Sequence, residues 1–295
     1  MTAGRIAAAL LWIAGVILGS VSERPAPAAP RMVDGLHVLA ADFHVHSFPG
    51  DGALPPWTLA REARRRGIDV IALTNHNHML SWPLARWTTS AATGVLLLPG
   101  QEVTTPAYHM TAIGITRTVR WDVSAARVAA DVHAQGGVAI VAHPDERAAR
   151  AIGPAFADVD GIETAHPARH AALRTQRELD AAVVEAMTMH PGIAQIGASD
   201  FHYLAPLGMC RTYVFAREAT ADGVIDAIRA GRTVACDARG QTYGDARLVA
   251  VVARDCAAAS AAPAAVQPQL ERIAIVSAWL GALGLTLLGP RRALQ

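Results

Sequence analysis

Two histidines separated by one residue, His44 and His46, lie at the end of an apolar run, 36–43, that is typical of a buried strand. On an extended backbone such side chains lie on the same face, so both imidazoles point the same way. Asp51 follows a Pro-Gly turn and adds a carboxylate nearby. Two imidazoles and a carboxylate can bind one divalent cation. A lone His-x-His pair is usually incidental, so the rest of the chain must decide.

Other predicted strands are followed by potential ligands in the same way. The apolar runs 69–74, 94–98, 137–142 and 193–198 predict short strands. The side chains that follow them are His76, Glu102 with His109, His143, and Asp200 with His202. Because ligands gather at the C-terminal ends of parallel strands, we expect these side chains to meet at one edge. Mixed imidazole and carboxylate ligands suit Zn, Mn or Fe.

Between the terminal regions, short apolar runs alternate with amphipathic segments, which predicts an α/β fold. The eight predicted strands are 36–43, 69–74, 94–98, 110–115, 137–142, 160–164, 193–198 and 212–216. The predicted helices are 56–66, 122–135, 168–189 and 220–230. We interpret His37, His133 and His190 as surface or packing residues, because they lie away from the predicted ligand edge.

The composition limits the partners of the protein. The chain has 295 residues, of which 52% are hydrophobic, and a net charge of +1. This charge gives no electrostatic case for nucleic acid as a partner. Apolar stretches at 6–21 and 273–289 suit a signal peptide or membrane anchor and a transmembrane helix. The alternative for the second stretch is a buried core helix.

The positions of these stretches predict a domain order and a location. Arg291 and Arg292 follow the second stretch and place its C-terminal end in the cytoplasm. We therefore expect a membrane-anchored protein with its catalytic domain outside the cytoplasm. The predicted parts are a signal peptide or N-terminal membrane anchor with a Pro/Ala linker (1–30), a globular domain (31–256), an Ala/Pro linker (257–272), a transmembrane helix (273–289) and a basic tail (290–295).

The three cysteines leave two interpretations open. Cys210, Cys236 and Cys256 have no Cys-x-x-Cys spacing, which argues against a cysteine zinc site or a redox motif. One disulfide with one remaining thiol is one interpretation. Three small buried side chains are the other.

The ordered ligand motifs resemble those of the polymerase and histidinol phosphatase (PHP) superfamily, over residues 38–240. The resemblance implies a distorted barrel of seven strands and helices. One position departs from the pattern, because this chain has Asn75 before His76 where many members have Asp. Asn carries no charge, which weakens any supporting role for this residue at a metal site.

The resemblance also implies two or three divalent ions. The first would be bound by His44, His46, Glu102 and Asp200. Glu102 would bridge to a second ion held by His109 and His143. The third would be bound by Asp51, His76 and His202.

The activity implied by the resemblance is that of a membrane-tethered, metal-dependent phosphoesterase. A hydroxide that bridges the ions of a trinuclear site would hydrolyse a phosphate mono- or diester of a small molecule. Asp200, His202 and Glu102 would be catalytic. Arg147, Arg169 and His166 are candidates for binding the substrate, since arginine pairs with phosphate.

Two alternatives remain at this point. The block 226–234 is loosely similar to the carbaryl-hydrolase-like branch of the superfamily. That similarity raises cleavage of a carbamate, amide or carboxylic ester by the same fold. A non-catalytic metal-binding module is the other alternative. The sequence does not determine the oligomeric state.

Overall fold

The computed structural model divides the chain into two units, 1–27 with 263–295, and 28–262. Each unit is considered by itself. The structure describes residues 2–22, 31–86, 93–167, 173–203, 206–261 and 268–287.

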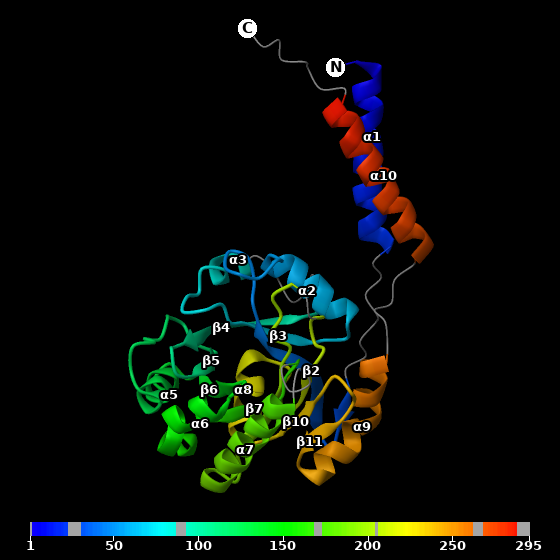
Figure 1. Cartoon of the computed structure of the whole chain (residues 1–295). Helices are drawn as coiled ribbons and strands as arrows, with labels where there is room; N and C mark the ends of the chain where they lie inside the picture. The colour runs from blue at the N-terminus through cyan, green and yellow to red at the C-terminus, as the bar shows by residue number, and fades with distance from the viewer. Residues whose placement is uncertain are drawn as a thin grey trace. The chain divides into compact units, whose positions relative to one another are not determined.

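The first unit is a pair of helices, α1 (Ala3–Ser22) and α10 (Pro268–Leu287), labelled in Figure 1. Glycines allow these helices to approach closely, because a Cβ on Gly15 would lie 2.4 Å from the backbone nitrogen of Ala278. In the described part of the chain, no helix combines the length and apolar character that spanning a bilayer requires. The predicted membrane anchoring, with a catalytic domain outside the cytoplasm, is therefore contradicted.

The second unit is built on one sheet of eleven strands within the described residues. Their order is β11-β10-β9-β2-β3-β4-β5-β6-β7-β8, and β1 pairs with β2. The strands are β1 (Met32–Val33), β2 (Leu36–Val45), β3 (Val70–Leu73), β4 (Leu96–Thr104), β5 (His109–Ile113), β6 (Val138–Ala142), β7 (Gly161–Ala165), β8 (Ala194–Gly197), β9 (Arg211–Ala216), β10 (Thr233–Cys236) and β11 (Thr242–Gly244). The α/β class and all eight predicted strands are confirmed.

The sheet curves until β8, the strand at one end of the order, meets β9, which makes the sheet a nearly closed barrel. The Gly197 amide of β8 donates to Thr212 Oγ1 of β9 (3.0 Å), and this hydroxyl donates to the Gly197 carbonyl (2.9 Å). Only glycine fits there, because a Cβ on Gly197 would lie 2.2 Å from the carbonyl oxygen of Arg211. The prediction of seven strands was too low, since β5 and the β9–β11 strands run antiparallel to their neighbours and enlarge the sheet.

Helices of the second unit pack around this sheet (Figure 1). They are α2 (Pro56–Arg65), α3 (Trp82–Ala85), α5 (Ala125–His133), α6 (Glu146–Ile152), η1 (Gly153–Ala157), α7 (Leu173–Met189), α8 (Ala221–Arg229) and α9 (Ala246–Ala261). Side-chain caps fix three helix starts, at Ser124, Asp145 and Thr220. The barrel interior is filled by apolar side chains, which include Phe43, Leu98, Ile113, Ile140 and Ile196.

A disulfide joins Cys236 of β10 to Cys256 of α9, and Cys210 is a free, buried thiol. This result supports one disulfide with one remaining thiol over three unpaired cysteines. Burial raises the pKa of Cys210 to about 12, so this thiol is protonated at neutral pH. The bonded helix α9 runs to Ala261, into the stretch 257–272 expected to be a linker.

Candidate metal centre

The predicted ligands come from strand ends that meet at one edge of the barrel. His44 lies near the end of β2, His46 directly follows its last residue, and their imidazole centroids lie 5.2 Å apart. Glu102 lies inside β4, which continues beyond the predicted strand 94–98. His109 begins β5, and because β5 runs antiparallel to β4, this start lies at the same edge. The hairpin therefore explains why a residue at a strand start joins residues at strand ends.

Four buried atoms converge at the centre of this edge. The Nε2 atoms of His44 and His46 each lie 3.4 Å from Glu102 Oε2 and 3.3 Å from Asp200 Oδ1. Among the described residues, none of these four atoms has a hydrogen-bond partner. Glu102 Oε2 also lies 2.5 Å from His76 Nδ1, without hydrogen-bonding geometry. Buried polar atoms without partners are costly, and a cation at their centre would compensate all four.

The second oxygen of Glu102 faces a different pair of imidazoles. Glu102 Oε1 lies 2.7 Å from His109 Nδ1 and 3.3 Å from His143 Nε2. Because the two carboxylate oxygens point at separate histidine groups, Glu102 has the geometry of a residue that bridges two cations. This arrangement agrees with the role implied by the resemblance.

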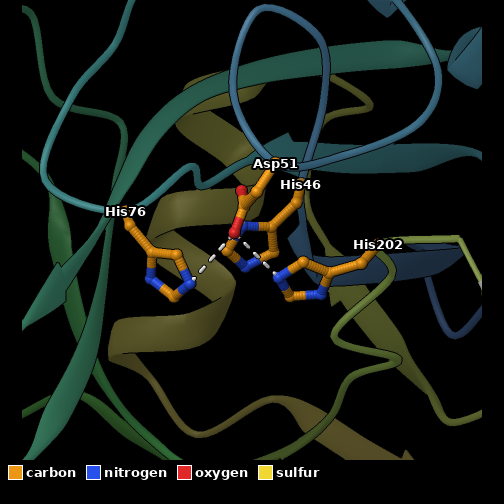
Figure 2. Close-up of side chains that lie close together, drawn as sticks. All are labelled: His46, Asp51, His76 and His202. Carbon is orange, nitrogen blue, oxygen red and sulfur yellow. Dashed lines mark hydrogen bonds and ion pairs between the residues drawn. The ribbon is translucent and has the colours of Figure 1, made fainter.

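A third group surrounds Asp51, as Figure 2 shows. Asp51 Oδ2 lies 3.2 Å from Nε2 of both His76 and His202. Asp51 Oδ1 lies 3.0 Å from His46 Nδ1, and the ring of His46 stacks on that of His202 at 3.8 Å. All nine predicted ligands thus fall in groups whose ligand atoms lie within 4.8 Å of one another. Their role as metal ligands stays a prediction.

The electrostatics of this edge favour positive charge. Burial disfavours protonation of His44, but Asp200, Glu163 and Glu102 outweigh this effect and raise its pKa. Burial likewise opposes protonation of His46, yet the neighbouring carboxylates of Asp200 and Glu102 raise its pKa to about 9. Burial alone would raise the pKa of Glu102, but His44 and the histidines bonded to it lower the value. The donor set therefore fits divalent cations.

The sequence analysis missed Glu163, which supports two of the predicted ligands. Glu163 Oε1 lies 2.8 Å from His44 Nδ1, and Glu163 Oε2 accepts the backbone N–H of His143 at 2.8 Å. The side chain is fully buried on β7. A hydrogen-bonded carboxylate behind a ligating histidine fixes the orientation of its ring. A signal existed, because Glu163 is an acidic side chain inside the predicted strand 160–164.

Asp42 was not predicted as a site residue either, because it lies within the strand β2 rather than after its end. Its carboxylate accepts hydrogen bonds from the amide (3.1 Å) and hydroxyl (2.5 Å) of Ser199 and from the Gly208 amide (2.8 Å). Burial raises its pKa to about 6. These bonds hold the segment before Asp200, whose φ of 49° lies in the left-handed region. Asp42 therefore helps to fix Asp200 next to His44.

Asn75 has a structural role that the sequence analysis underestimated. Its Oδ1 accepts the Ser47 amide at 2.7 Å, and its Nδ2 donates to the carbonyls of Ser47 (3.0 Å) and Pro49 (2.9 Å). An aspartate could not donate the last two bonds. The weakened supporting role at a metal site stays a prediction, and the uncharged amide fixes the loop that leads to Asp51.

The three candidate substrate residues lie in different settings. Arg147 is exposed on α6 and lines a pocket of about 250 Å³ together with His109 and His143. His166 is buried, with its Nε2 atom 3.5 Å from Asp200 Oδ2. Burial lowers the pKa of His166. Arg169 lies outside the described residues. The substrate role of all three stays a prediction.

Comparisons with known proteins agree with this fold. Residues 184–233 match a family model described as PHP-associated. An uncharacterized protein of Methanocaldococcus jannaschii is 25% identical over 139 residues, which cover 42% of this chain and 80% of that protein.

Solved structures are also similar to this chain. A two-domain protein from Bacteroides vulgatus, containing a predicted PHP-like metal-dependent phosphoesterase, is 24% identical with a TM-score of 0.59; the match covers 77% of this chain and 72% of that chain. A putative metal-dependent phosphoesterase from Bifidobacterium adolescentis is 20% identical with a TM-score of 0.45; that match covers 57% and 90% of the two chains. The carbaryl-hydrolase-like branch stays a prediction. The family-model match over residues 184–233 and the similarity of fold to the Bacteroides vulgatus protein support the resemblance to the PHP superfamily.

Proposed function

We propose that this chain is a metal-dependent hydrolase that cleaves phosphate mono- or diesters at a centre of two or three divalent ions. The observation that carries the proposal is the convergence of four buried ligand atoms without hydrogen-bond partners, from His44, His46, Glu102 and Asp200. The similarity to a two-domain protein with a predicted PHP-like phosphoesterase supports the reaction class.

Divalent ions at such a centre polarise phosphoryl oxygens and lower the pKa of water. The residues of the chain would position them. His44, His46, Glu102 and Asp200 would bind one ion, and Glu102 would share a second with His109 and His143. A third would lie between Asp51, His76 and His202, whose side chains point toward one another in Figure 2. Zn, Mn and Fe all suit these ligands.

Hydrolysis forms a bond from a water oxygen to phosphorus and breaks the bond from phosphorus to the alcohol oxygen. Asp200 would accept the proton of the attacking water. His202, whose Nδ1 lies 3.5 Å from Asp200 Oδ1, would donate a proton to the departing alcohol and then regain one from Asp200, so that both residues return to their initial states. Arg147, at the rim of the adjoining pocket, would bind an oxygen of the phosphate by its guanidinium group.

The direct test uses the full chain loaded with Mn or Zn and two chromogenic substrates, 4-nitrophenyl phosphate and bis(4-nitrophenyl) phosphate. We expect release of 4-nitrophenol that disappears in the His44→Ala/His46→Ala variant, together with a lower metal content by mass spectrometry. Cleavage of 4-nitrophenyl acetate or a carbamate, but of neither phosphate, would contradict the phosphoesterase. A wild-type chain that binds no metal would contradict the metal centre itself.

A further inference from the structure

Large apolar side chains are exposed on loops that supply the candidate metal centre. Phe48, Leu80 and Tyr203 have exposed fractions of 58%, 64% and 65%. Phe48 belongs to the loop before Asp51, and Tyr203 directly follows His202. Single exposed apolar side chains are common, whereas several around one site indicate a surface that binds an apolar partner.

Phe48 is held on a fixed backbone although its ring is exposed. Its amide donates to the Leu54 carbonyl at 2.9 Å. Its two neighbours, Ser47 and Pro49, are bound through their carbonyls by the Asn75 amide. Because the backbone is fixed on both sides of Phe48, binding a partner at the exposed ring would cost little further backbone entropy.

Leu80 lies in a segment that also contacts Asn75. The hydroxyl of Ser81, its neighbour in the chain, lies 3.5 Å from Asn75 Nδ2. Ser81 is buried, whereas Leu80 is exposed. The amide of Leu80 donates to His78 Nδ1 at 3.4 Å, which holds the turn after the strand that supplies His76. The segments that carry Phe48 and Leu80 therefore both contact Asn75.

Tyr203 directly follows a residue, His202, that is bonded to the loop of Phe48. The carbonyl of His202 accepts the amide of Ala53 at 2.8 Å. His202 Nε2 also lies 3.2 Å from Asp51 Oδ2, a contact that is visible in Figure 2. The segment before Tyr203 is thus bonded at two points to the loop that carries Phe48.

We propose that Phe48, Leu80 and Tyr203 form an apolar rim that binds the hydrocarbon part of the substrate. The inference rests on the proposed phosphoesterase function and makes it narrower: the substrate is a phosphoester of an alkyl or aryl alcohol. The gain from burying apolar surface grows with the area covered, so the rim selects substrates by the size of this group. Small hydrophilic phosphoesters would lack that contribution.

Equilibrium binding of alkylphosphonates to the Mn-loaded full chain tests this rim without requiring turnover. Calorimetry would compare methyl-, butyl- and octylphosphonate, whose carbon–phosphorus bond is not an ester. Full burial of a methylene corresponds to about fourfold in affinity, and we expect about twofold for each at a half-open rim. In the Phe48→Ala/Leu80→Ala/Tyr203→Ala variant, we expect affinities that no longer depend on chain length.

Two further variants separate the rim from general effects. Tyr203→Phe keeps the ring and should retain the chain-length dependence. Val184→Ala removes a side chain of 65% exposure from α7, away from the centre, and should also retain it. Circular dichroism of the triple variant would verify that it is folded. If the triple variant unfolds, the three single alanine variants carry the comparison, each with a weaker dependence expected.

The outcomes distinguish the rim from the reaction. Equal affinity for all three phosphonates, or an unchanged dependence in the rim variants, would overturn the rim even if phosphate esters are hydrolysed. A chain-length dependence that the rim variants abolish would support the rim even if no ester is hydrolysed, and the phosphoesterase would then be the part that fails. Binding of no phosphonate would count against both.

Discussion

Two groups of histidines and aspartates lie at opposite edges of the same barrel and differ in how their atoms are used. At the N-terminal edge of β6 and β7, Asp160 Oδ2 lies 2.7 Å from His133 Nε2 and accepts the Ala139 amide at 2.8 Å. His190 Nδ1 lies 2.9 Å from the Val159 carbonyl. These atoms all have partners within the protein, as expected of the predicted packing role.

At the other edge, buried nitrogen and oxygen atoms of His44, His46, Glu102 and Asp200 converge without hydrogen-bond partners. Cavity size does not single out the predicted ligands, because a pocket formed by described residues beside His133 measures about 470 Å³ and one beside His143 about 250 Å³. Buried polar atoms without partners, rather than residue type or pocket volume, therefore distinguish the predicted ligand site from the ion pair of His133 and Asp160.

The largest expected effect comes from changing the carboxylate of Glu102 to its amide, and the same change at Asp160 is the matched control. Glu102→Gln removes the charge that faces both histidine groups, and we expect the rate of phosphoester hydrolysis to fall by about 10³-fold, the equivalent of several kcal/mol of metal-ion catalysis. Bound metal should fall by at least one ion per chain. Asp160→Asn makes the same chemical change at the N-terminal edge of β6 and β7, which we call the saturated edge because the polar atoms described there all have partners. This variant should leave the hydrolysis rate and the metal content near the wild-type values. Equal losses in both variants would refute the distinction.

A smaller effect is expected for Glu163→Gln, which weakens the support of His44 without removing a predicted ligand. Loss of such a partner typically lowers metal affinity by about 10- to 100-fold. Competition with a chromogenic chelator would measure this change, and activity should recover at high metal concentration. Activity that stays low at saturating metal would instead mean that Glu163 acts on the reaction directly.

The difference between these two glutamates also shows what a sequence can predict. Glu102 and the other predicted ligands follow apolar runs, so their positions can be predicted from local pattern alone. Glu163 and Asp42 lie inside predicted strands, and their partners His44 and Ser199 are 119 and 157 residues away in the chain. No local pattern encodes these contacts, although a carboxylate inside a buried strand is a signal that some partner must exist.

The same limit applies to the fold. Most of the eight predicted strands are short apolar runs, whereas β1, β10 and β11 have only two, four and three residues and were not among the predicted strands. Barrel closure depends on Thr212 and Gly197, which contribute one hydroxyl and one missing side chain. The membrane prediction failed in the opposite way, because two apolar stretches were interpreted as membrane segments, whereas no described helix combines the length and apolar character that spanning requires.

At the saturated edge, Asp160→Ala should lower stability and leave the chemistry intact. The variant removes the acceptor of the Ala139 amide, and a buried donor without a partner costs about 1–3 kcal/mol. Urea unfolding would measure the loss, with metal content and hydrolysis as the parallel readouts. A loss of metal without a loss of stability would show that the two edges are coupled.

The smallest expected effect is a pH dependence of stability from the pair of His133 and Asp160. The hydrogen bond to Asp160 raises the pKa of His133 above its usual value of 6.5. A raised histidine pKa means that the folded state binds the proton more tightly, so the contribution is complete below pH 6.5 and is lost as pH rises through the folded value. Because the side chain of His133 is 39% exposed, solvent limits the contribution to about 0.2–1 kcal/mol.

Unfolding free energies of the wild type and His133→Gln, measured between pH 5 and pH 9, would reveal this contribution. The difference between the two proteins should be largest at the acidic end and approach a constant above the folded pKa. Measurement without added metal keeps the ligand edge from contributing a metal-dependent term of its own. A difference that grows with pH would mean that His133 is bound as the neutral imidazole. The saturated edge would then be held by neutral hydrogen bonds alone, and the contrast with the charged ligand edge would become sharper.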